Sequence, residues 1–296
     1  MAHTSAAEES ARFWRPPGLS GVDLLEARYV RKSFARHTHD TYVIAAVTEG
    51  VEAFRLRSDA HTAGVGALVL LNPDTPHTGH AGVPEGWRYS VLYPDVALVE
   101  EVARETSAID GTPGFLEPVV HDPSTARMVQ RVHRVAEAGD PLAADTLMRV
   151  AFAALLRRHA GPLPRRTVRS AGARTAEEAR AALRERMTAP PTLEELAREL
   201  GTGTFALLRR FRAEYGMPPH AWLTDARVRA ARSLLDEGMP PAQVAATVGF
   251  SDQSHLGRHF ARIVGVPPGA YARGRGRAPA QERTRPRRSP VPSVPP

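Results

Sequence analysis

The first third of the chain alternates short apolar stretches with turn signals. The clearest apolar stretches have strand-like composition and lie at residues 42–47, 53–56, 66–71 and 88–93. Turn-forming residues separate them at residues 49–50, 72–74 and 84–86. Many short strands close together along a chain predict a small β-barrel or sandwich.

From residue 96 onward the apolar positions follow the period of a helix. Helices are predicted at residues 96–105, 126–138 and 143–159, where they either cover one face of the barrel or pair with a second chain. Residues 160–175 have no hydrophobic period and contain several helix breakers, which predicts a linker at 161–175. Helices resume at residues 176–187, and Thr192 with Glu195 is typical of a capping box that starts the next helix.

The last third of the chain contains the same helical pattern twice. Leu196-Ala197 with Leu200-Gly201 returns 48 residues later as Val244-Ala245 with Val248-Gly249. A longer run then repeats with a spacing of 49 residues: Leu207, Arg209, Phe211, Gly216, Pro218-Pro219, Ala221 and Trp222 correspond to Leu256, Arg258, Phe260, Gly265, Pro267-Pro268, Ala270 and Tyr271. A duplicated short helix, sharp turn and second helix is typical of a protein that lays two helices into DNA grooves.

In each copy, one face of the second helix is apolar and the other carries groups that can contact DNA. In the first copy these groups are Arg209, Arg210 and Arg212. In the second copy Ser251 is the expected N-cap, and Asp252, Gln253, His255 and Arg258 are the exposed polar positions. A connecting helix at residues 224–237, about 21 Å long, would place the two recognition helices roughly one DNA turn apart.

The residues of this region resemble the signature of the AraC/XylS family of transcription regulators. The match lies at Ala230, Leu234-Leu235, Val244-Ala245, Gly249-Phe250, Ser254, Leu256, Arg258, Phe260, Gly265, Pro267-Pro268 and Tyr271. The resemblance covers about residues 176–272 and implies two helix-turn-helix motifs joined by a long helix. It implies base-contacting positions at Phe205, Leu208 and Arg209 in the first recognition helix and at Gln253, Ser254 and Arg258 in the second. Leu208 stands where the family usually has a small or polar residue.

Charge and composition change this picture little. The net charge is +7, and the tail at residues 273–296 supplies six of these charges through seven arginines against Glu282. That tail is rich in Arg and Pro and is expected to be disordered. The chain has no cysteine, which excludes disulfides and thiolate zinc sites. No apolar run approaches the roughly 20 residues that span a bilayer, so a cytoplasmic protein without membrane contact is expected.

Three histidines in the first third of the chain form a second candidate site. His37 and His39 precede the first good strand, and His77 follows the turn Asn72-Pro73-Asp74. Two histidines spaced by one residue on a strand point to the same side, and a third from a paired strand can complete a metal site. This layout resembles the cupin barrel and the effector-binding domain that AraC-type regulators carry before their DNA-binding half.

Two interpretations of these histidines follow. A metal-dependent cupin enzyme is the alternative, but metal-binding cupins usually place a glutamate four or five residues after the His-x-His, where this chain has Val43 and Ile44. The favoured interpretation is an organic effector pocket without a cofactor, and the chain has no other catalytic motif. Its candidate residues are His37, His39, His77, Trp87, Arg88 and Tyr89. Strand alternation lets either Arg88 or the pair Trp87 and Tyr89 face inward.

The sequence thus predicts an α+β protein of two domains that acts as a regulator and not as an enzyme. A cupin-like effector-binding and dimerisation domain is expected at residues 20–160, and an all-α DNA-binding domain with two helix-turn-helix motifs at residues 176–272. The expected partners are double-stranded DNA, a small-molecule effector, a second copy of the chain and RNA polymerase. Activation of transcription is the commoner outcome in the resembling family.

Overall fold

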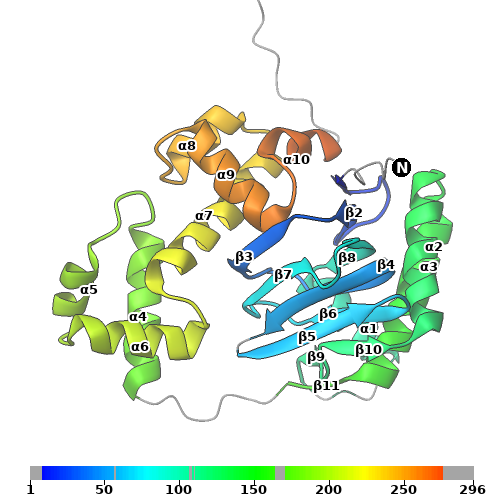
Figure 1. Ribbon diagram of the computed structural model, residues 1–296, viewed down its shortest axis with the longest axis horizontal. Coiled ribbons are helices and arrows are strands. Elements are labelled where there is room, and N and C mark those ends of the chain that lie inside the picture. The colour runs from blue at the N-terminus through cyan, green and yellow to red at the C-terminus, as the bar shows by residue number, and fades with distance from the viewer. Residues whose placement is uncertain (1–8, 57, 107–108, 110, 164–170, 276–296) are drawn as a thin grey trace, which may run out of the picture.

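The computed structural model describes residues 9–56, 58–106, 109, 111–163 and 171–275. A sheet-rich domain comes first and a helical domain follows it (Figure 1). Within the described part of the chain, nine strands form one antiparallel sheet: β1 (Ser10–Trp14), β2 (Val22–Tyr29), β3 (Ser33–His37), β4 (Val43–Leu56), β5 (Asp59–Gly64), β6 (Ala67–Leu71), β7 (His77–Ala81), β8 (Trp87–Pro94) and β10 (Val119–His121). A short pair, β9 (Pro113–Phe115) and β11 (Ala160–Pro162), stands apart.

Strand β4 belongs to both halves of the sheet. Its first part pairs with β6 and β8, and its second part pairs with β5 and β7. The predicted turn at residues 49–50 is wrong, because β4 runs through it with a bulge between Val47 and Glu49. Gly50 permits this bulge: its φ is +66°, and a Cβ there would lie 1.9 Å from the carbonyl oxygen of Gly86.

Alternation along the strands gives the first domain two apolar layers. On β4, Val43, Ala45 and Val47 face the interior between the two halves of the sheet, while Ile44 and Ala46 face the helices. Helices α1 (Val96–Thr106), α2 (Pro123–Glu137) and α3 (Pro141–His159) cover that outer face, so the helices predicted after the strands are confirmed.

The helical domain confirms the duplicated unit. It contains α4 (Ala171–Glu185), α5 (Leu193–Glu199), α6 (Thr204–Tyr215), α7 (Pro219–Asp236), α8 (Pro241–Thr247), α9 (Gln253–Val264) and α10 (Pro268–Gly274). Helices α6 and α9 are the second helices of the two repeated units, and each ends at a left-handed glycine, Gly216 or Gly265. The capping box of Thr192 and Glu195 is present at α5. The connecting helix α7 has 18 residues, so it is about 27 Å long and longer than expected.

Three local predictions need correction. The N-cap of α9 is Asp252, whose carboxylate accepts a hydrogen bond from the His255 N–H, and not Ser251. The predicted linker at 161–175 is partly regular structure, because β11 extends to Pro162 and α4 begins at Ala171; residues 164–170 lie outside the described residues. The predicted start of the tail at residue 273 is too early, because the side chain of Arg275 is nearly buried against Asp23 and Asp236. Residues 276–296 lie outside the described residues.

The two helix-turn-helix units have different cores. Helices α4, α5, α6 and the start of α7 form a core of their own around Leu207 and Phe211. The rest of α7 with α8, α9 and α10 packs into one continuous core with the inner face of the sheet, where the Phe13 ring packs at a tilt against Tyr271 with ring centroids 5.0 Å apart. The second unit is therefore built onto the first domain (Figure 1).

Buried polar contacts fix α7 to the end of β3. The carboxylate of Asp225 on α7 is fully buried and accepts hydrogen bonds from Thr38, at 3.2 Å from the backbone N–H and 2.6 Å from the hydroxyl. Arg229 lies 3.4 Å from the same carboxylate and 2.8 Å from that of Asp74. Burial raises the pKa of Asp225, and Arg229 and Thr38 oppose this shift by stabilising the charged form.

We expect Asp225→Ala to lower the free energy of unfolding by roughly 3 kcal/mol, because it leaves Thr38 and Arg229 without their buried acceptor. Denaturant unfolding followed by tryptophan fluorescence measures this loss. Asp74→Asn is the control: Asp74 pairs with the same Arg229, but its side chain is 72% exposed and asparagine tolerates the left-handed backbone at φ 56°, so we expect a loss below about 1 kcal/mol. Equal losses in the two variants would contradict the role of the buried contact.

Candidate effector pocket and nucleic-acid interface

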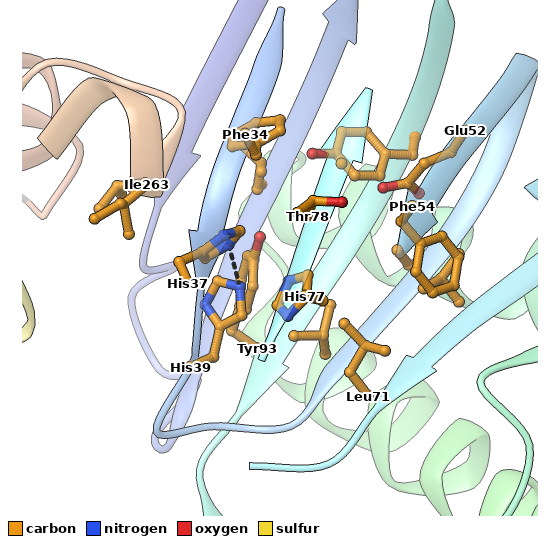
Figure 2. A pocket seen from close by; sticks show the side chains of 17 residues that line it. Phe34, His37, His39, Glu52, Phe54, Leu71, His77, Thr78, Tyr93 and Ile263 are labelled. Atoms are coloured by element: carbon orange, nitrogen blue, oxygen red, sulfur yellow. Dashed lines mark hydrogen bonds between the residues drawn. The ribbon is translucent and has the colours of Figure 1, made fainter. Parts of the chain in front are cut away.

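A small cavity lies between the two halves of the sheet, under the second helix-turn-helix unit. Its walls come from β2, β3, β4, β6, β7 and β8, and Ile263 and Val264 at the end of α9 complete its lining. Figure 2 shows Ile263 approaching from the helical domain beside His37 and Phe34. The cavity volume is about 40 Å³, which is room for a few water molecules.

The three histidines of the sequence analysis meet at one side of this cavity. His37 Nε2 lies 3.1 Å from His39 Nε2, and the ring centroids of His37 and His77 are 4.3 Å apart (Figure 2). The rings of His37 and His77 each donate a hydrogen bond to the backbone carbonyl two residues earlier. His37 Nδ1–H donates to Ala35 O at 2.8 Å, and His77 Nδ1–H donates to Thr75 O at 2.9 Å. The Nε2 atoms of His37 and His77 therefore carry lone pairs.

Burial keeps the three imidazoles neutral. It lowers the pKa of His37 to about 4 and that of His77 to about 3. Burial also lowers the pKa of His39 well below its ordinary value, with a further contribution from its neighbours His37 and His77. A buried neutral imidazole can bind a ligand as a hydrogen-bonding partner or as a metal ligand, but it carries no charge to attract an anion.

Glu52 of β4 lies on the opposite wall of the cavity from His39 (Figure 2). It is 9% exposed, its Oε2 has no hydrogen-bond partner within the described structure, and burial raises the pKa of its carboxyl to about 8. Glu52 is therefore a protonated carboxylic acid at neutral pH, which can donate one hydrogen bond to a ligand.

The structure resolves which residues of β8 face inward. Tyr89 lines the cavity, while Arg88 lies on the outer face with its Nε 3.1 Å from Glu49 Oε1, so Arg88 is not part of the pocket. Trp87 is 1% exposed but packs in the core against Tyr29 and Tyr89 and does not line the cavity.

Sequence reasoning missed several pocket residues. Tyr93 shares the inward face of β8 with Tyr89, and the strand period was the signal that could have found it. Phe34 and Glu52 sit on strands whose register depends on the bulge in β4 and on β7. Ile263 and Val264 carry no such signal, because only the docking of α9 brings them to the cavity.

The first recognition helix presents a basic, partly apolar surface. Phe205 is 76% exposed, Arg209, Arg210 and Arg212 are exposed, and Leu208 is half-buried. Arg210 donates to the Thr202 hydroxyl at 3.1 Å, so it is held near the turn before α6. An exposed aromatic ring beside three arginines is suited to a groove and its phosphates.

The second recognition helix presents its polar side chains at its N-terminal half. Gln253, Ser254 and Arg258 are exposed, as a base-reading helix requires. Asp252 is also exposed, but its carboxylate caps the helix. His255 Nδ1 lies 3.0 Å from the Ser251 hydroxyl, and its ring packs on Phe250. Asp252 and His255 thus make contacts within the helix start, while the side chains of Gln253, Ser254 and Arg258 make no hydrogen bond or ion pair within the part of the chain that the structure describes.

Comparisons with known proteins agree with both halves of this description. A family model described as an AraC-like ligand binding domain matches residues 19–152, and a helix-turn-helix domain model matches residues 196–274. The HTH-type transcriptional regulator YbfI of Bacillus subtilis is 26% identical over 241 residues, which cover 79% of this chain and 86% of that protein. The thermoregulatory protein LcrF of Yersinia pestis is 27% identical over 189 residues, 63% of this chain and 68% of that protein.

Solved structures show the same two-domain fold. ToxT from Vibrio cholerae O395 has a TM-score of 0.52 at 13% identity, and the alignment covers 90% of this chain and 97% of that one. ToxT from strain SCE256 with an unsaturated fatty acid bound has a TM-score of 0.51 at 14% identity, covering 92% and 98%. No helix in the described residues has the length and apolar composition needed to cross a membrane.

A ligand-binding domain joined to two helix-turn-helix motifs defines a ligand-responsive, DNA-binding transcription regulator. This chain belongs to the AraC family of such regulators, as the resemblance of its repeated motif predicted.

Glu52 gives a pH signature of the closed pocket. Between pH 4.5 and about 8 the folded chain keeps a proton on Glu52 that the unfolded chain has lost, so this group lowers stability by up to about 1.4 kcal/mol per pH unit as the pH rises. In Glu52→Gln this loss is absent. We therefore expect the free energy of unfolding of the variant minus that of the wild type to rise from pH 4.5 to 8 and then level off.

Urea unfolding at several pH values measures this difference. Glu49→Gln, at an exposed position on the same strand, controls for the chemical change itself. A Glu52→Gln difference that is constant between pH 5 and 8 would show that Glu52 is ionised in the folded protein.

Proposed function

We propose that the chain activates transcription by binding specific DNA sites through α6 and α9, and that a ligand in the pocket changes how the second helix-turn-helix unit is held. The observation that carries this proposal is the position of α9. Its N-terminal half presents Gln253, Ser254 and Arg258 to the outside, and its C-terminal end places Ile263 and Val264 on the pocket. One helix therefore belongs to both sites.

The mechanism we propose is a population shift. The cavity of about 40 Å³ is far smaller than the roughly 300 Å³ or more that a drug-sized ligand needs. An effector of that size must move α9 away from the sheet, and it would favour conformations in which the second unit is less tightly docked. The two recognition helices could then adjust to the spacing of two successive major grooves.

A second copy of the chain is the further partner that we propose. Leu142 and Val150 on α3 are 77% and 50% exposed, and they lie two turns apart on one helix face. A pair of such faces would bury apolar side chains that are now in contact with water. An activator also needs to contact RNA polymerase, and a protein that acts on DNA in this way is expected in the cytoplasm.

We take residues 20–160 as the effector-binding domain and residues 176–272, with the short continuation through Arg275, as the DNA-binding domain. The relatives reported above are named as a transcriptional regulator, YbfI, and a thermoregulatory protein, LcrF, which supports a regulatory and not an enzymatic role for the pocket.

We expect Arg258→Ala to weaken binding to a preferred DNA site by about 1–3 kcal/mol, roughly 5- to 150-fold, and to relax discrimination at one base pair. The preferred site is first selected with the wild-type chain from random duplexes, and the selection is then repeated with the variant at the same salt concentration. Arg127→Ala removes an exposed arginine from α2, on the other domain, and controls for the loss of one positive charge. An unchanged sequence preference in Arg258→Ala would remove this residue from the base-reading positions.

A further inference from the structure

The histidine cluster has a geometry that the regulator function does not require. We propose that His37, His39 and His77 bind one divalent transition-metal ion on the inner wall of the pocket. This inference goes beyond the proposed function, because the ion can be measured without any DNA. It also differs from the organic-ligand role that the sequence favoured for these histidines.

The first argument is the convergence of the ligand atoms. One ring nitrogen from each of the three histidines lies within 4.8 Å of the other two, and the Nε2 atoms of His37 and His39 are 3.1 Å apart. Two imidazole nitrogens that share an ion at about 2.0–2.1 Å lie roughly 3.0–3.4 Å from each other. The His37–His39 pair already has this spacing, in a hydrogen bond from His39 Nε2–H to His37 Nε2 whose proton an ion would replace, and His77 has to move closer to the pair.

The second argument is the way the rings are held. The carbonyls of Ala35 and Thr75 accept hydrogen bonds from the Nδ1–H groups of His37 and His77, so both rings are turned with a lone pair on Nε2. Histidine ligands in metal sites commonly donate their other N–H to a backbone carbonyl in this way, which fixes the tautomer and the ring orientation. In both residues the bond that satisfies the buried Nδ1–H leaves Nε2 as the unprotonated nitrogen, which is the form that a metal ion needs.

The third argument is the size and polarity of the cavity. A volume of about 40 Å³ accommodates an ion with one or two small ligands, while the three rings leave coordination positions open toward the cavity. Glu52 lies across the cavity with an unpartnered carboxyl oxygen, so it adds a second polar group to the lining.

The charges around the cluster permit a cation. Arg229 and Arg232 on α7 face His39, but Arg229 pairs with Asp225 and Asp74, and Arg232 lies 3.5 Å from Asp40 and 3.7 Å from Asp23. The chain has no cysteine to offer a thiolate, and three imidazoles suit Zn²⁺, Ni²⁺, Cu²⁺ or Fe²⁺ better than Mg²⁺ or Ca²⁺.

A bound ion would act directly on the contact between the domains. Thr38 stands between the ligands His37 and His39, and its N–H and hydroxyl donate to Asp225 of α7. Tying His37 and His39 to one ion restricts the backbone that presents Thr38. We therefore expect the ion to strengthen the docking of the second helix-turn-helix unit, a consequence that rests on the proposed function.

The test uses the untagged full-length chain, stripped with a chelator and dialysed. Titration with Zn²⁺ in a calorimeter, and with Co²⁺ followed by its visible absorption, should give one ion per chain. Loss of a supporting residue alone typically weakens a metal site 10- to 100-fold, so we expect His39→Ala and His77→Ala to weaken binding by at least about 100-fold. His80→Ala is the matched control, because His80 lies on the same strand as His77 but is exposed and outside the cluster.

Each outcome decides one part of the proposal. Folding of the metal-free variants is checked by thermal melting, and the half-buried His39 makes His39→Ala the variant least dependent on core packing. Absence of stoichiometric binding, binding that survives His39→Ala and His77→Ala in folded protein, or an equal loss in His80→Ala would overturn the site. Equal DNA affinity of the metal-loaded and stripped wild type would overturn the effect on docking alone. Failure of both forms to bind any selected DNA would count against the proposed function and leave the ion titration valid.

Discussion

The buried carboxylate of Asp225 is the constraint on which the arrangement of the two domains depends. A carboxylate taken out of water is stable only when donors surround it, and here the donors are Thr38 of the first domain and Arg229 of its own helix. Because α7 connects both helix-turn-helix units, this one contact fixes the central element of the DNA-binding domain to the end of β3. Any arrangement of the second unit on the sheet therefore has to keep hydrogen-bond donors beside the buried carboxylate of Asp225.

The two DNA-binding units therefore differ in mechanical freedom despite their common pattern. The second unit shares its core with the inner face of the sheet, whereas the first packs around Leu207 and Phe211 in a core of its own. Lys32 adds to the fixation of the second unit by donating from Nζ to Ala261 O at 2.5 Å. Events in the first domain should reach α9 through the shared core, whereas α6 meets that domain only at its C-terminal end, where Gly216 lies close to Pro76 and Arg36.

The sequence predicted the local elements well where one period dominated. The repeated helices, the capping box at Thr192 and the alternation along β4 all follow from spacing that neighbouring residues impose. Errors occurred where a non-local partner decided the outcome. Residues 49–50 have the composition of a turn, but β4 continues through them with a bulge because it pairs with β8. Arg275 has the sequence context of a basic tail, but it forms an ion pair with Asp23, which lies more than 250 positions earlier in the chain.

In the candidate pocket, too, features set by local spacing could be predicted, and contacts between distant segments could not. His37, His39 and His77 could be grouped from their spacing, and the structure brings them together: His37 of β3 pairs with His77 of β7, and His39 follows just after the end of β3. The part of the cavity lining that α9 contributes could not be predicted in this way. Ile263 and Val264 are ordinary apolar residues at the buried end of a helix, and nothing in their own neighbourhood distinguishes packing within the helical domain from packing on a cavity in another domain.

The use of α9 by both sites has a mechanical consequence. The ten residue steps from Gln253 to Ile263 correspond to about 15 Å of helix, and the intervening Phe260 is fully buried in the shared core. A helix of this length moves as a rigid body, so a displacement at Ile263 has to change the position or the tilt of Gln253 and Arg258. No chain of side-chain rearrangements is needed to carry a signal from the pocket to the DNA-facing residues, because a single helix is in contact with both.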